Sequence, residues 1–315
     1  MSRRVFLTGG SGVIGRAAVP ALRAAGWDVD AAVRSDDAAA VVEAGGARPV
    51  VVDLFDARAV ARAAAGHDAI VHLATAVPPM SRMHRKPAWT QHNRLRVDAT
   101  RVLLDAARLH GITRFVKESV TFTYRDGGDA WLDEAAPVDA VPVWQPTLEG
   151  ERLAGEHTRH GGDGVVLRFG ALYAAGARST DEYRRLARLH LAPVTGRPDA
   201  YLSSLHADDA ATAVVAALTV APRTYNVVDD RPLVRAEYTA AVARAFGVGR
   251  LRTVPVTPMR LLAGDAVRAV SASQRVDNRA FRDATGWRPR WTDAVEGWSA
   301  IGAELHPRPV LREVP

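Results

Sequence analysis

The sequence predicts an α/β fold with a doubly wound parallel sheet and a smaller C-terminal domain. Short β-branched runs alternate with longer helical patterns through the first half of the chain, which is typical of βαβ units. A glycine-rich turn follows the first of these runs, and the regular alternation loosens after Phe169. These observations together indicate a Rossmann-type sheet followed by a second, less regular unit.

Six compact hydrophobic runs are predicted to be strands that are buried on both faces of the sheet. They are Val5–Thr8, Asp28–Val33, Pro49–Asp53, Ala69–Leu73, Arg114–Ser119 and Gly164–Phe169. Helices are expected between them. The segment Leu95 to His110 has the pattern of a crossover helix, and Gly111 is a natural residue to end it.

The turn after the first predicted strand reads Gly9-Gly10-Ser11-Gly12-Val13-Ile14-Gly15, and a helical run follows it. Gly10, Gly12 and Gly15 have the spacing that permits a tight turn, close approach of a diphosphate and packing of helix on sheet. The first amides of the helix supply unpaired donors and a positive dipole end. A dinucleotide is therefore expected here.

The end of the second predicted strand bears on the choice between NAD and NADP. Arg34 stands where NAD-binding proteins place an acidic residue for the ribose hydroxyls, and a guanidinium suits a 2′-phosphate. The sequence therefore favours NADP (NADPH), with NAD as the alternative. In that alternative Arg34 is an exposed strand-end residue and Asp36 or Asp37 binds the ribose.

The chain resembles the extended short-chain dehydrogenase/reductase family, the NAD-dependent epimerase/dehydratase-like group, over most of its length. The similar segments are Thr8 to Gly15, Val52-Asp53-Leu54, His72-Leu73-Ala74-Thr75, Leu167 to Tyr173, Leu205 to Ala210 and the strand Tyr225-Asn226-Val227. The loop and the resemblance together imply that the cofactor is bound by Gly9, Ser11, Gly12, Val13, Ile14, Gly15, Arg34, Asp53, Leu54, Leu73, Ala74, Thr75, Phe169 and Leu172.

The chain differs from this family in its catalytic residues. Typical members hold a Tyr-x-x-x-Lys pair as general acid/base, and no such motif occurs anywhere in this sequence. The corresponding positions fall near Val143 and Thr147. The fifth strand leads instead to Ser119, Thr121 and Tyr124, which are the candidate catalytic residues because doubly wound sheets bind ligands at the carboxyl ends of their strands.

The predicted domains follow from these patterns. Residues 1–172 form the dinucleotide-binding Rossmann domain, to which 201–228 return, and residues 173–200 and 229–315 form the smaller substrate-binding domain. No metal site is expected from the spacing of histidines and carboxylates. His72 is expected to be a core histidine. Asp208 and Asp209 are expected to cap a helix that follows His206. The three loop tryptophans either pack between domains or line an apolar pocket: Trp131, Trp144 and Trp287.

Composition bounds the setting and the partners. The 315 residues contain no cysteine, begin without a signal-peptide pattern and include no apolar run of membrane-spanning length, so we expect a cytoplasmic protein that does not bind membranes. The formal charge of +6 is mostly arginine and is spread along the chain, so nucleic acid is not an expected partner. A local basic cluster is either a solvated surface or an anion site: Arg82, His84, Arg85, Lys86, Arg94 and Arg96. A small-molecule substrate and a monomer or homodimer are expected.

Three functions remain open at this point. The first is an atypical NADP-dependent reductase that transfers hydride to the carbonyl of a ketone or enone, with the proton supplied by Tyr124, Ser119, Thr121, water or an acidic hydroxyl of the substrate. The second is a non-catalytic NADP-binding sensor or scaffold. The third is a non-redox cyclase or isomerase on the same fold.

Overall fold

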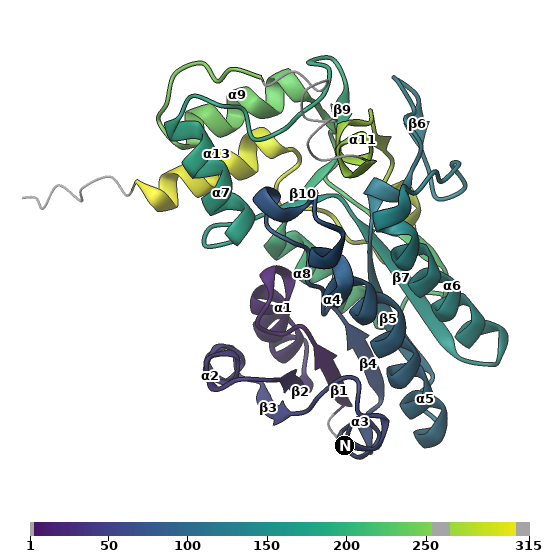
Figure 1. Cartoon of the computed structure of the whole chain (residues 1–315). Helices are drawn as coiled ribbons and strands as arrows, with labels where there is room; N and C mark the ends of the chain where they lie inside the picture. Colours follow the sequence, from purple (N-terminus) through teal and green to yellow (C-terminus); the bar gives the residue numbers. More distant parts are fainter. Residues whose placement is uncertain (1–2, 254–264, 307–315) are drawn as a thin grey trace, which may run out of the picture.

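The computed structural model describes residues 3–253 and 265–306, which form two lobes around separate hydrophobic cores (Figure 1). The larger lobe holds a seven-stranded sheet whose neighbouring strands are all parallel, in the order β11-β7-β5-β4-β1-β2-β3. The predicted fold class is confirmed. The strands are β1 (Arg3–Thr8), β2 (Trp27–Val33), β3 (Arg48–Val51), β4 (Ala69–His72), β5 (Arg114–Val120), β7 (Asp163–Phe169) and β11 (Thr224–Val227).

The order of the strands reverses between β1 and β4. From β1 the chain adds β2 and then β3 on one side, whereas β4, β5, β7 and β11 extend the sheet on the other side. The loops that leave the carboxyl ends of β1 and β4 therefore diverge. This divergence opens a crevice at the point where doubly wound sheets bind their ligands.

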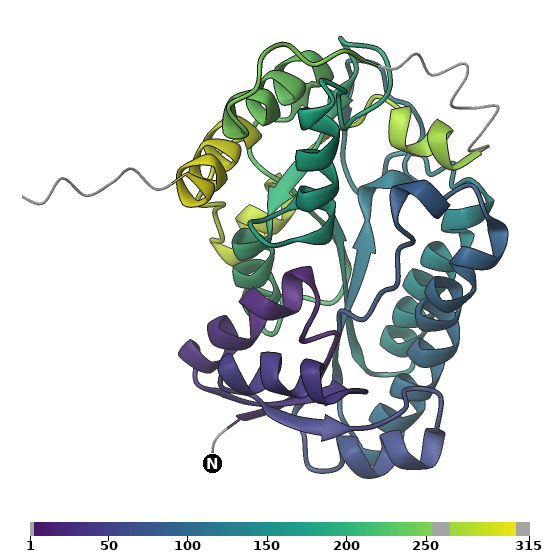
Figure 2. The ribbon, with the colours of Figure 1, turned by 60° about the vertical axis from the view of Figure 1, so that its left-hand side comes forward.

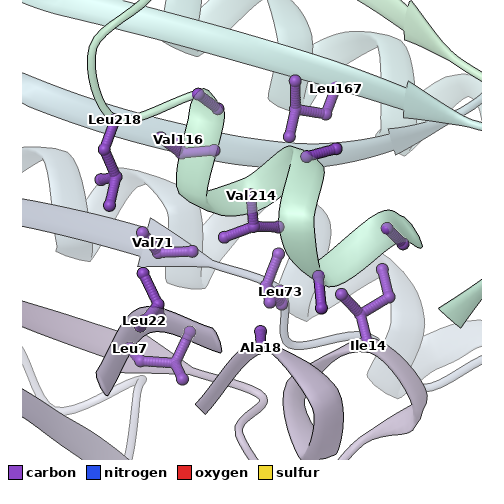
Figure 3. Packing of buried hydrophobic residues seen from close by; sticks show 14 of the residues in the cluster. Leu7, Ile14, Ala18, Leu22, Val71, Leu73, Val116, Leu167, Val214 and Leu218 are labelled. Atoms are coloured by element: carbon purple, nitrogen blue, oxygen red, sulfur yellow. The ribbon is translucent and has the colours of Figure 1, made fainter. Parts of the chain in front are cut away.

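Helices cover both faces of the sheet. Helices α1 (Val13–Ala24) and α8 (Ala207–Ala216) share one face, where Ala18 and Val214 pack against Leu7 and Val71 of the strands (Figure 3). The opposite face carries α3 (Ala57–Ala64), α5 (Thr100–His110) and α6 (Gln145–Arg159), and α2 (Asp36–Ala44) lies beside β2 and β3. This burial on both faces explains why consecutive apolar residues occur in the strands, as in Val5–Leu7 and Val165–Leu167.

The predicted crossover helix is longer and less regular than expected. It begins with α4 (Thr90–Arg94), passes through a π-helical segment, Leu95–Ala99, and continues as α5. It ends at Gly111, whose φ of 65° is left-handed, as the sequence predicts. The π-helical segment brings Leu95 and Arg96 inward, toward the end of the sheet that carries the crevice.

The smaller lobe has its own core, in which Trp298 stacks on Tyr173 with ring centroids 5.1 Å apart. Figure 2 shows its helices gathered above the sheet. They are α7 (Arg178–Arg188), α9 (Arg235–Ala245), α11 (Asp265–Ser271) and α13 (Ala294–Leu305), with the short pairs β8 (Ala171–Tyr173) and β10 (Ser204–His206), β9 (Tyr201–Leu202) and β12 (Leu233–Val234), and β6 (Trp131–Leu132) and β13 (Arg275–Val276).

One part of the predicted smaller domain packs elsewhere. Phe281 of α12 (Arg279–Thr285) and Trp287 belong to the hydrophobic core of the seven-stranded sheet, beside Tyr225 of β11. Residues 254–264 and 307–315 of that domain lie outside the described residues. Among the helices that the structure describes, none is long and apolar enough to cross a membrane.

Candidate functional site

A cavity of about 500 Å³ lies at the crevice between the ends of β1 and β4. Its lining comes from the loop after β1 and the first turn of α1, from the ends of β2 and β3, from the segment after β4 and from single residues of four further elements. The cavity therefore runs across the carboxyl edge of the sheet. The residues predicted to bind a cofactor that line it are Gly9, Ser11, Gly12, Val13, Ile14, Gly15, Arg34, Asp53, Leu54, Leu73, Ala74, Thr75 and Leu172.

The glycine loop forms the narrow part of this cavity. Gly9 has a φ of +79°, and a Cβ there would lie 2.6 Å from the backbone of Leu73 and Ala74. A Cβ on Gly15 would lie 2.1 Å from the Gly9 carbonyl oxygen. Gly12 is the N-cap of α1 and offers no side-chain acceptor, so the first amides of the helix have no partner within it. The loop therefore fits a dinucleotide diphosphate, held by backbone donors.

The end of β2 supplies a cationic side chain to the same cavity. Arg34 and Ser35 both line it, and within the described part of the chain Arg34 is exposed and makes no ion pair. The Ser35 hydroxyl caps α2 by accepting from the Ala38 amide at 3.3 Å. Asp36 and Asp37 lie in the first turn of α2 and do not line the cavity.

Phe169 is the exception among the predicted cofactor residues. Its side chain is wholly buried in the sheet core, because it is the last residue of β7 and points to the face covered by α1 and α8. Leu172, three residues later on β8, reaches the cavity instead. The prediction for Phe169 is therefore corrected.

Sequence reasoning missed Glu118, which lines the cavity from β5. Its carboxylate forms an ion pair with Arg96, a side chain with no exposed surface, and Arg96 also donates to the Glu118 carbonyl at 2.7 Å. Lys117 donates to the same carbonyl at 3.0 Å. Burial, helped by the nearby Arg96 charge, lowers the pKa of Lys117 to about 7, although Glu118 and Glu151 oppose this shift.

The three candidate catalytic hydroxyls have different surroundings. Ser119 donates at 2.5 Å to Glu151, whose carboxylate also accepts from Arg168 at 2.9 and 2.6 Å. Tyr124 is buried and donates at 2.7 Å to Asn226. Thr121 is also buried, and its hydroxyl has no hydrogen-bond partner in the described part of the chain. None of the three lines the coenzyme cavity.

Helix α6 and the turn before it carry the positions where the family places its tyrosine and lysine. Val143 is half-buried just before the helix, and Thr147 is 1% exposed with a hydroxyl that has no partner among the residues that the structure describes. One turn later Gly150 lies against the Arg96 backbone, where a Cβ would be 2.7 Å from the carbonyl oxygen. The helix approaches the crossover helix closely at this point, and Lys117 fills the adjoining space from the strand side.

His72, His206 and Asp209 have structural roles. His72 is a core histidine, as predicted, bonded to Thr8 and to the Leu95 carbonyl. His206 is itself the N-cap of α8, because its ring accepts from the Asp208 amide. Asp209 instead accepts from the Arg290 and Trp291 amides, so the expected capping by this pair of acids is wrong for Asp209.

The three tryptophans lie in different surroundings, and so do the members of the basic cluster. Trp131 is exposed beneath Arg275, Trp287 is buried in the sheet core, and Trp144 is buried in a separate cluster with Trp89. Of the basic cluster, Arg94 stacks over Phe55 at 3.8 Å and Arg96 is buried, whereas four members are exposed on one loop: Arg82, His84, Arg85 and Lys86. Among the described residues, no group of histidines and carboxylates could hold a metal ion.

The parallel sheet, the glycine loop and the cavity at the switch point define a dinucleotide-binding protein of the dehydrogenase type. The chain belongs to the NAD dependent epimerase/dehydratase family, which matches residues 5–227.

A Streptomyces protein named 3-diazoavenalumate denitrifying reductase is 37% identical over 309 residues, which cover 93% of this chain and 99% of that protein. A Stigmatella aurantiaca protein, 4-hydroxy-2-methyl-3-oxo-4-farnesyl-3,4-dihydroquinoline-1-oxide ketoreductase, is 34% identical over 140 residues, 44% of this chain and 40% of its own. Human epimerase family protein SDR39U1, solved with NADPH, shares the fold: its TM-score is 0.79 at 21% identity, covering 95% of this chain and 99% of its own. The chain is therefore an NAD(P)-dependent oxidoreductase of this family.

Proposed function

We propose that this protein is an NADPH-dependent reductase that acts on a small organic acceptor without a tyrosine acid. One observation carries this proposal: the coenzyme cavity keeps its glycine loop and an unpaired Arg34, whereas the chain has no Tyr-x-x-x-Lys pair. When bound, the reduced coenzyme supplies a hydride, and the protein binds and orients it. Arg34 and Ser35 would hold the 2′-phosphate, which is the basis for favouring NADPH.

The acceptor that suits this site best is a diazo carbon conjugated to a ring oxygen. Hydride forms the new carbon–hydrogen bond, the carbon–nitrogen bond breaks, nitrogen leaves as N₂, and the remaining negative charge rests on the ring oxygen as a phenolate. A phenol has a pKa near 10, so water can protonate the product without a dedicated acid. The name of the Streptomyces relative, a reductase that removes nitrogen from a diazo compound, supports this choice.

A carbonyl acceptor is the second candidate, and the ketoreductase relative favours it. Hydride addition to a ketone leaves an alkoxide, which needs a proton from a donor in the site. Ser119 and Tyr124 already donate to Glu151 and Asn226. Of the three candidates, Thr121 is the one whose hydroxyl has no acceptor within the described part of the chain, so it is the residue that we propose for this reaction.

The test is to incubate the protein with NADPH deuterated at the transferable position and with either 3-diazonio-4-hydroxybenzoate or phenanthrenequinone. We expect 4-hydroxybenzoate that carries deuterium at the former diazo carbon, together with N₂ and NADP⁺. Deuterium transfer to the quinone alone would favour the carbonyl reaction. Tight coenzyme binding without transfer to either probe would support the sensor or scaffold hypothesis. Conversion of a probe with no NADPH consumed, such as hydrolysis of the diazo probe to 3,4-dihydroxybenzoate, would support a non-redox enzyme.

A further inference from the structure

Three aromatic side chains meet edge to face where the crossover helix and α6 begin. The ring centroids of Trp89 and His92 are 5.3 Å apart, those of Trp89 and Trp144 are 5.3 Å apart, and those of His92 and Trp144 are 5.7 Å apart. Phe122, which follows β5, lies 6.0 Å from Trp144. We call Trp89, His92, Trp144 and Phe122 the aromatic cluster. It joins the start of the crossover helix to the start of α6.

Within the described part of the chain, buried polar atoms in and next to the aromatic cluster have no hydrogen-bond partner. They are both ring nitrogens of His92, the indole nitrogen of Trp144 and the hydroxyl of the adjacent Thr147, and these residues are 0%, 3% and 1% exposed. The Trp89 indole differs, because it donates to the Met83 carbonyl at 2.8 Å. Buried polar groups are almost always hydrogen-bonded, so several unpaired ones in one place indicate a missing partner.

The unpaired atoms of Thr147 and His92 lie at the same height along two neighbouring helices. Helix α6 and the crossover helix both lead from one parallel strand to the next, so they run in the same direction. Gly150 abuts the Arg96 backbone, and one turn earlier on each helix stand Thr147 and His92. Arg96 in turn binds Glu118, which lines the coenzyme cavity. The unpaired atoms are therefore about one helical turn from Arg96, whose partner Glu118 lines the coenzyme cavity.

The charges around the cluster favour a negative oxygen. Burial lowers the pKa of His92 to about 2, with Arg96 and Lys117 adding to the effect, so the ring is neutral and keeps one donor and one acceptor nitrogen. Thr147 and Trp144 add two further donors. The two nearby cationic side chains are Arg96 and Lys117, and the neighbouring acid Glu118 already forms an ion pair with Arg96. A phenolate would meet donors and positive potential here.

We propose that the aromatic cluster is the acceptor subsite, which binds a planar aromatic ring through its oxygen. The ring packs against Trp89, Trp144 and Phe122, and its phenolate or quinoid oxygen accepts hydrogen bonds from Thr147 and Trp144, with His92 as the third donor. In this structure the side chains close on one another, and the incoming ring replaces those contacts. The assignment rests on the proposed function, since it names the substrate class of the same site.

The test measures binding of 2-naphthol and of its methyl ether by calorimetry, with and without NADP⁺. We expect 2-naphthol to bind and the ether, which cannot become an anion, to bind at least tenfold more weakly. Thr147→Val should weaken 2-naphthol binding about tenfold and yet leave the thermal midpoint unchanged or raised, because it removes an unpaired hydroxyl at nearly constant volume. Trp144→Phe should weaken binding by a similar factor.

Two matched variants serve as controls. Thr158, on the same helix, accepts from the Gly164 amide at 3.0 Å, so Thr158→Val should lower the midpoint and leave binding unchanged. Trp287 belongs to the core of the seven-stranded sheet, where its indole donates to Thr212 at 3.0 Å. Trp287→Phe should therefore bind 2-naphthol as tightly as wild type. Equal binding of 2-naphthol by wild type, Thr147→Val and Trp144→Phe would overturn the subsite, and so would an ether that binds as tightly as the phenol.

Failure of the subsite and failure of the proposed function are separate results. Absence of 2-naphthol binding, in a protein that binds NADPH and transfers deuterium to the diazo probe, would reject the subsite alone. Loss of coenzyme binding would reject the proposed function, and the titration without NADP⁺ would still show whether the aromatic cluster binds 2-naphthol.

Discussion

The hydroxyl of Ser119 donates a hydrogen bond of 2.5 Å to the carboxylate of Glu151. The same carboxylate binds the guanidinium of Arg168 through two further hydrogen bonds, and both charged side chains are more than nine-tenths buried. Ser119 of β5 and Arg168 of β7 are register neighbours in the sheet, and Glu151 reaches them from α6. The strand-end serine therefore serves to fix a buried ion pair between sheet and helix.

Replacing Ser119 should affect stability more than turnover. We expect Ser119→Ala to lower the free energy of unfolding by about 1 kcal/mol, the value of one hydrogen bond to a paired group. Because the hydroxyl does not line the coenzyme cavity, kcat should stay within a few-fold of wild type. Denaturant unfolding and steady-state kinetics measure the two effects. A hundredfold fall in kcat at unchanged stability would show that Ser119 is catalytic.

Removing the carboxylate of the same network should be far more damaging. Glu151→Gln leaves the Arg168 charge buried without its counterion, which typically costs about 3–5 kcal/mol. Denaturant unfolding measures the loss. Glu156→Gln on the exposed side of the same helix is the control, since its partner Arg152 is about half exposed and such pairs contribute little. Equal losses in the two variants would contradict the assigned burial.

Tyr124→Phe tests the tyrosine that the sequence offered as a proton donor. Burial raises the pKa of Tyr124, although Arg168 opposes this, and its hydroxyl is bonded to Asn226. We expect loss of about 1–2 kcal/mol of stability, since the Asn226 oxygen is left buried without this donor, and an unchanged pH profile of kcat. A profile that loses an ionisation in the variant would restore Tyr124 as an acid.

The fold was accessible from sequence because its signals are local. Each of the six predicted strands lies within two residues of an observed strand, and the turn from Gly9 to Gly15 has the geometry that its spacing predicts. The π-helical segment at Leu95–Ala99 was not predicted, because a helical pattern does not reveal an extra residue in one turn. Packing of Phe281 on the sheet was missed for a similar reason, as it depends on distant contacts.

The candidate site was accessible only in part. Residues that follow strand ends could be placed from the chain order, but Phe169 was assigned to the cavity although its side chain points into the core. Glu118 and Thr147 carry no motif. Their positions depend on the partners Arg96 and Gly150, which the fold brings together from separate segments. The one available signal for Glu118 was the pair of neighbouring charged residues, Lys117 and Glu118, in a strand predicted to be buried on both faces.

Gly15→Ala should abolish coenzyme binding. The added Cβ would lie 2.1 Å from the Gly9 carbonyl oxygen, so the loop must move away from the position that fits a diphosphate. We expect at least a hundredfold loss of affinity for NADPH in a titration. Gly249→Ala is the control, since a Cβ there meets no atom within 4 Å. Unchanged affinity of the Gly15 variant would mean that the coenzyme does not approach this loop.

Asp209 should make stability depend on pH. Burial, with a smaller contribution from Asp208, raises its pKa to about 6 from 3.8, despite two backbone hydrogen bonds that oppose the shift. The folded state then binds the proton more tightly than the unfolded state, so this stabilisation is complete below pH 3.8 and is lost as the pH rises through about 6. The loss is on the order of 3 kcal/mol.

Unfolding measured from pH 4 to 7 tests this. Across that range the free energy of unfolding of wild type should fall more steeply than that of Asp209→Asn. The difference between the two curves is the contribution of Asp209. Asp208→Asn is the matched control, because Asp208 is exposed on the same turn. Identical slopes in wild type and Asp209→Asn would refute the raised pKa.

Calorimetric titration of the wild-type protein with NADPH and with NADH shows whether the cavity between β1 and β4 binds a nicotinamide coenzyme. We predict that both coenzymes bind, that NADPH binds at least tenfold more tightly, and that Arg34→Ser removes this preference without weakening NADH. If neither coenzyme binds, the cavity between β1 and β4 is not a nicotinamide site, and the reductase assigned to it is contradicted.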